Sequence, residues 1–167
     1  ILIKAASEDY DNYTVARNLA DALMELKPDL IFFGKQSIDF DGMAIPAMVA
    51  TMLNHPFVNV VTKLEINGND ISVEREIEGG KEIITSSLPA IIGTQKGINN
   101  PRYPNLKSIM ASKSKPIDEK PSTYSGNKTE IVNMSLPPAK GKGKILEGGT
   151  DSAAELVKLL RDEAKII

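Results

Sequence analysis

The chain has 167 residues, 41% of them hydrophobic, and a formal net charge of −2 at pH 7. This length suits one domain with a real core, and the slight acidity argues against a nucleic-acid partner. No cysteine is present, which excludes disulfides, thiolate metal sites and thiol nucleophiles. The only histidine, His55, adjoins a proline that ends a helix, so we predict neither a metal site nor a Ser–His–Asp triad. We find no signal peptide and no apolar run that could insert into a membrane, and therefore expect an intracellular protein.

The first part of the chain follows the pattern of a β–α–β unit. A short apolar run at 1–3 predicts a buried strand, and a polar turn at 7–12 follows, in which Asp11 or Asn12 caps a helix. The second strand, at 30–33, should run parallel to the first after a right-handed crossover. The helix between them has one apolar face, formed by Val15, Leu19, Ala22, Leu23 and Leu26.

The stretch 30–47 reads as a strand, a polar loop bounded by glycines, and a helix that begins near Met43. The first N–H groups of a helix have no intrahelical partner and its dipole favours an anion, so such a junction is typical of a phosphate site. Many strand–loop–helix units bind nothing, however, and the stretch alone leaves the question open. Asp39 and Asp41 favour helix capping, with Asp41 as the N-cap, over acid–base chemistry. There is no GxGxxG or Walker sequence.

The hydrophobic period then changes from 3.6 to 2. Apolar residues alternate over 58–66 and again over 71–77, and the Asn-Gly pair between them predicts a hairpin. A turn of two glycines leads to a third strand at 81–87, and an apolar run at 89–94 reads as another buried strand. The sequence therefore predicts an antiparallel meander appended to a parallel α/β core.

The last part of the chain is less regular. Residues 95–106 show no periodicity and contain two prolines, which predicts an exposed loop, and a short helix should follow at 107–112. Residues 115–128 are rich in Ser, Pro, Lys and Gly and read as a linker.

A terminal helix closes the chain, with Ser152 and Glu155 spaced as a capping box. Its apolar stripe is formed by Ala153, Leu156, Val157, Leu160 and Ala164. We expect a nucleotide-binding α/β domain over 1–114, followed by a linker and an extended C-terminal arm over 115–167. Such an arm needs a surface to pack on, which this chain does not fully supply.

Several segments resemble the β subunit of electron transfer flavoproteins. The segments at 34–41, 73–80 and 100–106 carry the resemblance, with support from 88–90, 109–110 and 156–167. The motifs VEREIEGG and NPRYPNL are the most specific of them. They fall in the family's order and correspond to roughly the last two thirds of such a subunit, so we expect a fragment that lacks the first strand.

The resemblance implies a parallel nucleotide-binding sheet of the adenine nucleotide alpha hydrolase type. It also implies a heterodimer with an α subunit that holds most of a redox FAD, while the β subunit buries an AMP. Family members are electron carriers without a catalytic constellation of their own. They accept electrons from acyl-CoA dehydrogenase-type flavoenzymes and pass them to a quinone reductase or another acceptor. The expected location is the cytoplasm, or the mitochondrial matrix in a eukaryote.

The resemblance also implies cofactor-binding residues, because the family's nucleotide phosphate meets the loop and helix start of this segment. They are Gly34, Gln36, Asp39, Asp41, Gly42, Met43, Ala44 and Ile45. Known members carry Asn, Gln and Thr where this chain has Met43, Ala44 and Ile45. Side-chain hydrogen bonds to the nucleotide should therefore be lost, whereas backbone N–H contacts need no particular side chain.

A partner-binding set follows from the same resemblance: Glu76, Pro101, Arg102, Tyr103 and Leu106. The loop at 97–106 matches the family's recognition loop, in which a leucine at the position of Leu106 enters a hydrophobic pocket on the dehydrogenase. Apolar residues around an arginine suit a small interface. The alternative for Leu106 is a side chain folded back onto its own domain. Glu76 matches a glutamate that pairs with a partner arginine, and its alternative is a solvated strand residue.

Two other functions stay open. One is a bifurcating β subunit, in which a second FAD replaces the AMP. The other is a regulatory module of similar fold that binds an adenine nucleotide and has no redox role. The flavin content of the purified complex separates the three.

Overall fold

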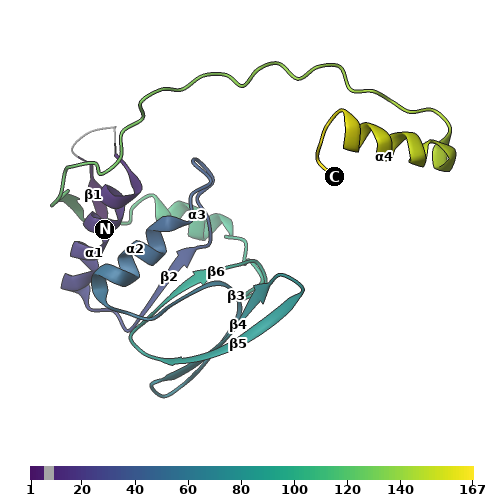
Figure 1. Ribbon diagram of the computed structural model, residues 1–167. Helices are drawn as coiled ribbons and strands as arrows, with labels where there is room; N and C mark the ends of the chain where they lie inside the picture. The colour runs from purple at the N-terminus through teal and green to yellow at the C-terminus, as the bar shows by residue number, and fades with distance from the viewer. Residues whose placement is uncertain (6–9) are drawn as a thin grey trace. The chain divides into compact units, whose positions relative to one another are not determined.

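The computed structural model describes residues 1–5 and 10–167 (Figure 1). Contacts group residues 1–130 and residues 131–167 into two compact units, which are described separately below. The sequence places the change at residue 115, and that domain boundary stays a prediction. The turn predicted at 7–12 lies partly outside the described residues.

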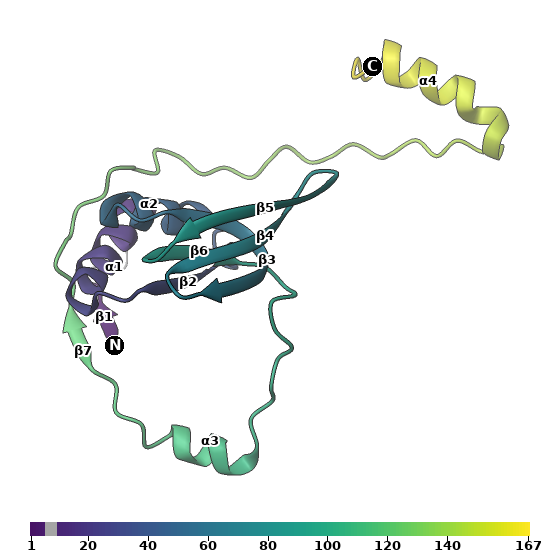
Figure 2. The ribbon, with the colours of Figure 1, turned by 90° about the horizontal axis from the view of Figure 1, so that it is seen from below.

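The first unit is built on a mixed sheet, which Figure 2 shows from below. Its strands are β2 (Leu30–Gly34), β3 (Phe57–Asn67), β4 (Asp70–Ile77), β5 (Gly80–Ser87) and β6 (Ala90–Thr94). The order across the sheet is β2-β6-β3-β4-β5. The β2–β6 and β6–β3 pairs are parallel, and the β3–β4 and β4–β5 pairs are antiparallel. The predicted combination of a parallel core and an antiparallel meander is therefore confirmed.

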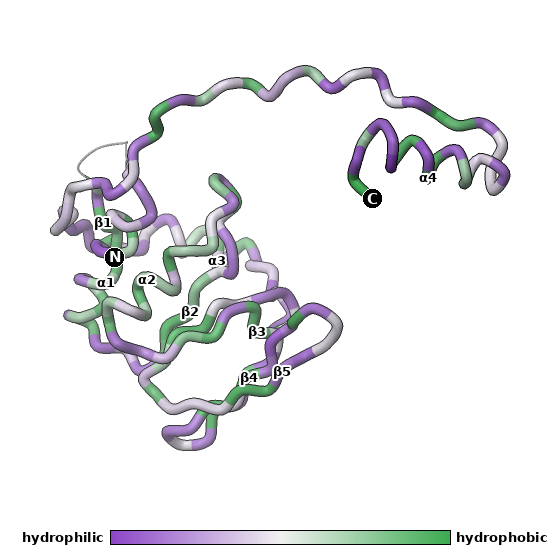
Figure 3. Tube along the Cα trace, in the orientation of Figure 1, coloured by the Kyte–Doolittle hydropathy of each residue, from purple (hydrophilic) through white to green (hydrophobic). Residues whose placement is uncertain are grey.

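Helices α1 (Asn12–Leu26) and α2 (Ala44–Leu53) pack together against β2 and β6 (Figure 1). Figure 3 shows how apolar both β2 and α2 are along their length. The core beneath these helices contains Ala16, Ala20, Ile31, Val49, Ala50 and Ile91. A second cluster lies between β6 and the meander and contains Val58, Val61, Ile71, Val73, Ala90 and Ile92. Since Ile91 and Ile92 belong to different clusters, β6 is buried on both faces.

The start of α1 and the C-terminal ends of α1 and α2 follow from local chemistry. Asp11 is the N-cap of α1, and its Oδ1 accepts a hydrogen bond from the Thr14 N–H at 2.8 Å. Lys27 and Asn54 end α1 and α2 in the left-handed conformation, with φ of 48° and 54°. The prediction that Asp11 or Asn12 caps the first helix is confirmed for Asp11.

The expected pairing of the first strand is wrong. Strand β1 (Leu2–Lys4) lies outside the main sheet and pairs in parallel with β7 (Glu119–Pro121). The Leu2 N–H donates to the Asp118 carbonyl at 2.8 Å, and the Ser122 N–H donates to the Lys4 carbonyl at 3.0 Å. A three-residue strand with no buried side chain has little apolar surface to place it in the main sheet, so backbone pairing decides its partner.

The remaining helices are short. Helix α3 (Leu106–Ser112) has no buried residue, and the second unit contains a 3₁₀ turn, η1 (Gly149–Ser152), followed by α4 (Ala153–Asp162). Ser152 is the N-cap residue of α4, but the predicted capping box does not form. The Ser152 hydroxyl instead donates to the Glu147 carbonyl at 2.8 Å, and the Glu155 carboxylate pairs with Lys144 Nζ at 3.3 Å.

A close approach between β3 and β6 leads to a stability prediction. The Asn59 side chain lies over Gly93, so a Cβ at residue 93 would clash with Asn59 Oδ1 and would lie 3.2 Å from Asn59 Cα. We expect Gly93→Ala to lower the free energy of unfolding by about 1–3 kcal/mol through overpacking, measured by urea denaturation. Gly80→Ala is the matched control, because a Cβ there would have no heavy atom within 4 Å. Equal stability of the two variants would contradict the proposed clash.

Candidate functional site

The loop between β2 and α2 is closed by its own hydrogen bonds. After Gly34 ends β2, the Lys35 N–H donates to the Thr94 carbonyl at 3.2 Å. The Ser37 N–H donates to the Gly42 carbonyl at 2.9 Å, and the Gly42 N–H donates to Ser37 Oγ at 3.1 Å. These bonds fix the path of the chain into α2 at the carboxyl end of a parallel strand, where α/β sheets bind ligands.

The prediction that Asp41 caps α2 is wrong. The N-cap is Met43, which makes no side-chain capping bond. Asp41 lies two residues earlier with φ of 57°, and its side chain accepts a hydrogen bond from Gln36 Nε2. Asp41 does not cap the helix because its backbone is in the left-handed conformation and its carboxylate is hydrogen-bonded to Gln36.

The backbone N–H groups at the start of α2 are therefore left without a capping side chain. Within the described part of the chain, no hydrogen bond uses the backbone N–H of Met43, Ala44 or Ile45. The next residue, Pro46, has no N–H and is buried. Free N–H groups at the positive end of a helix dipole suit a phosphate group. The donor set fits the phosphate of AMP and that of FAD equally, because only backbone atoms supply it.

The two aspartates of the loop are poor phosphate ligands. The Ser37 side chain and the Phe40 N–H, which lies 2.8 Å from Asp39 Oδ1, hold the pKa of Asp39 below its usual value. Asp39 is thus an anion at neutral pH, and it would repel a phosphate brought close to it. Lys35 carries the opposite charge and makes no ion pair with any described residue.

The predicted cofactor-binding residues thus form one continuous segment around the loop, with different local roles. Gly42, Ala44 and Ile45 are half-buried at the helix start, and the others are exposed. Sequence reasoning did not single out Ser37 and Lys35. The sequence feature that could have identified them is a hydroxyl and a positive charge within the same polar loop.

The second predicted region surrounds the start of α3. Pro101, Arg102 and Tyr103 are exposed, and Leu106 is 76% exposed as the first residue of the helix. In the described structure Leu106 therefore does not fold back onto its own domain. Asn105 fixes this geometry, because its Oδ1 accepts a hydrogen bond from the Ser108 N–H at 2.9 Å. Ile109 and Met110 follow Leu106 at helical spacing, so the exposed face of α3 includes three large apolar side chains.

Glu76 lies apart from this loop, near the end of β4. It is exposed and sits opposite Lys81 of β5, but Lys81 Nζ pairs with Glu74 at 2.5 Å. No side-chain hydrogen bond or ion pair joins the Glu76 carboxylate to any described residue, although its charge adds to that of Glu74 in raising the pKa of Lys81. Its carboxylate is free to pair with a cation on another molecule.

Two features are absent from the residues that the structure describes. None of the helices there is long and apolar enough to cross a membrane. In the same part of the chain, no three or more His, Cys, Asp or Glu side chains are grouped so that they could hold a metal ion.

Comparisons with known proteins agree with the motifs. Residues 1–124 match the family model described as the electron transfer flavoprotein domain. The chain is 37% identical over 168 residues to the electron transfer flavoprotein subunit beta of Bacillus subtilis, covering 96% of this chain and 65% of the relative. It is 36% identical to the subunit beta of Syntrophomonas wolfei (93% and 62% covered) and 36% identical to the mitochondrial subunit beta of Oryza sativa subsp. japonica (92% and 60% covered). The chain thus spans less than two thirds of the length of these relatives.

Proposed function

Since the chain belongs to the electron transfer flavoprotein β-subunit family, we propose that it is the nucleotide-binding and donor-recognising part of a heterodimeric electron carrier. The partner is an electron transfer flavoprotein α subunit. The proposed donors are acyl-CoA dehydrogenase-type flavoenzymes, and the acceptor is a quinone reductase or a related protein. The carrier works in the cytoplasm, or in the mitochondrial matrix if the organism is a eukaryote.

The observation that carries the proposal is the uncapped start of α2. Its free N–H groups at Met43, Ala44 and Ile45 follow a strand of the parallel core. The family's nucleotide segment falls on the same residues, although their side chains are apolar here. An AMP phosphate held by the backbone needs no side-chain donor, so the Met-Ala-Ile sequence is compatible with nucleotide binding.

The chemistry of electron transfer comes from the FAD, which accepts and releases electrons when bound. The residues of this chain contribute binding and orientation. The α2 start holds the nucleotide phosphate, and Ser37 and Gly42 keep the loop closed around it. The side chains of Leu106 and Glu76 are exposed and available for contact with partner proteins. The arm at 131–167 supplies a surface for the α subunit.

Flavin content is the decisive experiment. The complete subunit is purified with its α subunit, and the flavin absorbance is compared with the protein concentration. About one flavin per heterodimer, with AMP released on denaturation, supports the carrier with a structural AMP. Two flavins support the bifurcating form with a second FAD in the β subunit. A complex without flavin supports the non-redox regulatory module and contradicts the proposal.

Gly42 offers a site-specific test of the nucleotide loop. A Cβ at this position would lie 3.5 Å from Ser37 Oγ, an ordinary contact, so Gly42→Ala should keep both fold and nucleotide. Gly42→Val places two more methyl groups beside the free N–H groups and should weaken nucleotide retention about tenfold, for a clash of about 1.4 kcal/mol. The measurement is chromatography of AMP, ADP and FAD released from the denatured complex. Equal retention by the Ala and Val variants would remove Gly42 from the site.

A further inference from the structure

A polar stripe runs along α1 beside its apolar face. The stripe begins at the N-cap and recurs at steps of three, four, three and four residues, which places its members on one side of a helix. They are Asp11, Thr14, Asn18, Asp21 and Glu25. The apolar stripe alone accounts for the packing of α1 on the core, so these polar residues need another explanation.

The stripe holds an extended segment, residues 120–129, which we call the strap. The strap runs antiparallel to α1, so that its start lies at the end of the helix. Lys120 Nζ pairs with Glu25 at 2.7 Å, and the Thr123 hydroxyl donates to Asp21 Oδ2 at 2.7 Å. At the other end of the helix, the Thr14 hydroxyl donates to the Gly126 carbonyl at 3.1 Å.

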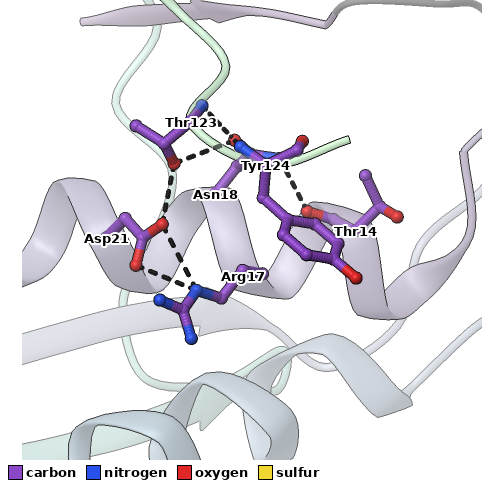
Figure 4. Close-up of polar contacts among 6 residues, drawn as sticks. All are labelled: Thr14, Arg17, Asn18, Asp21, Thr123 and Tyr124. Atoms are coloured by element: carbon purple, nitrogen blue, oxygen red, sulfur yellow. Dashed lines mark hydrogen bonds and ion pairs between the residues drawn. The ribbon is translucent and has the colours of Figure 1, made fainter. Parts of the chain in front are cut away.

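Asn18 fastens the middle of the strap (Figure 4). Its Oδ1 accepts hydrogen bonds from the N–H groups of Thr123 at 2.8 Å and Tyr124 at 3.1 Å. Its Nδ2 donates to the Tyr124 carbonyl at 2.9 Å and to the Thr14 carbonyl at 2.8 Å. The amide thus replaces the strand partner that the backbone of residues 123–124 lacks. The Tyr124 ring also meets Tyr13 edge-on, with centroids 5.7 Å apart.

Asp11 fastens the end of the strap with one carboxylate oxygen and caps α1 with the other. Oδ1 accepts from the Thr14 N–H, while Oδ2 accepts from the N–H groups of Lys128 at 2.6 Å and Thr129 at 3.0 Å. Partial burial raises the pKa of Asp11, but the hydrogen bonds from Thr14, Lys128 and Thr129 outweigh it and hold the pKa far below its usual value. The carboxylate therefore stays charged at neutral pH, which strengthens its bonds to N–H groups.

We propose that Asp11 and Asn18 are positioning residues that fix the point at which the arm leaves the α/β unit, at residue 130. The inference rests on the proposed function in one respect, that the arm binds the α subunit. The strap makes residues 115–130 part of the α/β unit and leaves about 18 residues, 131–148, as free chain before η1. When the α/β unit is also held by the α subunit, a shorter tether raises the effective concentration of the arm at its docking surface.

The tether length sets the size of the effect. If the strap detaches up to β7, the free chain extends over about 26 residues (123–148), and if β7 also separates it extends over about 36 (113–148). Effective concentration falls as roughly the −3/2 power of tether length. Release of the strap should therefore weaken the tethered association of the arm by about two- to threefold.

The test is Asp11→Asn in the complete subunit, alone and with Asn18→Ser. Asparagine keeps an oxygen that caps α1, but its NH₂ replaces Oδ2 and faces the donors of Lys128 and Thr129. Hydrogen exchange of the free subunit should show protection of the Lys128 and Thr129 amides reduced about tenfold or more, with α1 still protected. Glu65→Gln is the control, because it removes an exposed carboxylate that pairs only with Lys63 and touches no strap residue. The affinity for the α subunit is measured for each variant.

Each outcome decides one claim. Unchanged amide protection in Asp11→Asn would overturn the strap. Lost protection with an unchanged affinity for the α subunit would overturn the positioning role while leaving the strap in place. If the subunit truncated after residue 150 binds the α subunit as tightly as the complete one, the proposed function of the arm fails instead. Lost protection with affinity two- to threefold weaker supports the proposal.

Discussion

Removal of residues 151–167 should abolish stable association with the α subunit. Helix α4 has no buried residue, and Leu156, Val157, Ile166 and Ile167 are all exposed. Exposed apolar groups of this kind mark an interaction surface. Burial of each side chain in a complex stabilises it by up to about 1.5–3 kcal/mol, so the loss of all four should weaken binding more than about a hundredfold. Co-purification of a tagged truncated subunit with its α subunit is the measurement.

The extended part of the arm supports the same expectation. Five of its large apolar side chains are exposed: Ile131, Val132, Met134, Leu136 and Ile145. Burial of these apolar side chains on another chain would be favourable, because it removes apolar surface from water. The arm therefore acts as a continuous ligand for a partner surface, with α4 at its end.

Point substitutions test whether α4 binds the α subunit through its apolar face, because they leave the helix itself in place. Leu156→Glu with Leu160→Glu keeps helix propensity and places charge on the apolar stripe, so binding should be lost as in the truncation. Lys158→Ala with Asp162→Ala changes the exposed polar face and should leave binding intact. Association of the glutamate variant at the unaltered affinity would show that α4 does not dock through this face.

Much of the fold follows from local signals in the sequence. The Asn67-Gly68 turn, the alternation on β3 and β4, and the cap at Asp11 each depend on neighbours within a few residues and agree with the structure. The family motifs add the order of the segments, and the family model matches residues 1–124, which include the three segments that carry the resemblance. These features were predictable because short-range chemistry specifies them.

Two of the misses depend on partners that lie far along the chain. The sequence shows β1 as a strand, but its pairing with β7 joins residues more than a hundred positions apart. The strap resembles a linker in composition, and only the polar stripe on α1, with Asn18 at its centre, turns it into ordered chain. Asp41 was a plausible cap by position, yet Gln36 holds its carboxylate. A stripe of polar residues at helical spacing was the available signal for the strap.

Leu106→Ala should raise the apparent KM for the carrier in a dehydrogenase assay by about ten- to a hundredfold. The side chain is 76% exposed at the start of α3, so the free subunit loses little packing when it is truncated. Burial of this leucine in a pocket on the donor would stabilise the complex by about 1.5–3 kcal/mol. Each 1.4 kcal/mol corresponds to about a tenfold change in affinity. Folding and flavin content should stay unchanged.

Ile83→Thr is the matched control for this experiment. Ile83 on β5 is 73% exposed, so its replacement removes a similar apolar surface outside the loop and keeps a β-branched residue in the strand. We expect its KM to equal that of the unaltered carrier. An equal rise in both variants would show that the assay responds to general surface hydrophobicity rather than to the recognition loop.

Glu76→Ala should behave differently from Leu106→Ala. Because Lys81 pairs with Glu74, the Glu76 carboxylate is available to a partner arginine without breaking an existing ion pair. An exposed pair of this kind contributes at most about 1 kcal/mol to docking, so KM should change less than about fivefold. If the pair forms only while the flavin moves toward the donor, the electron-transfer rate should fall instead, which single-turnover kinetics measures. A rate unchanged by Glu76→Ala, together with a KM unchanged by Leu106→Ala, would place donor recognition elsewhere on the subunit.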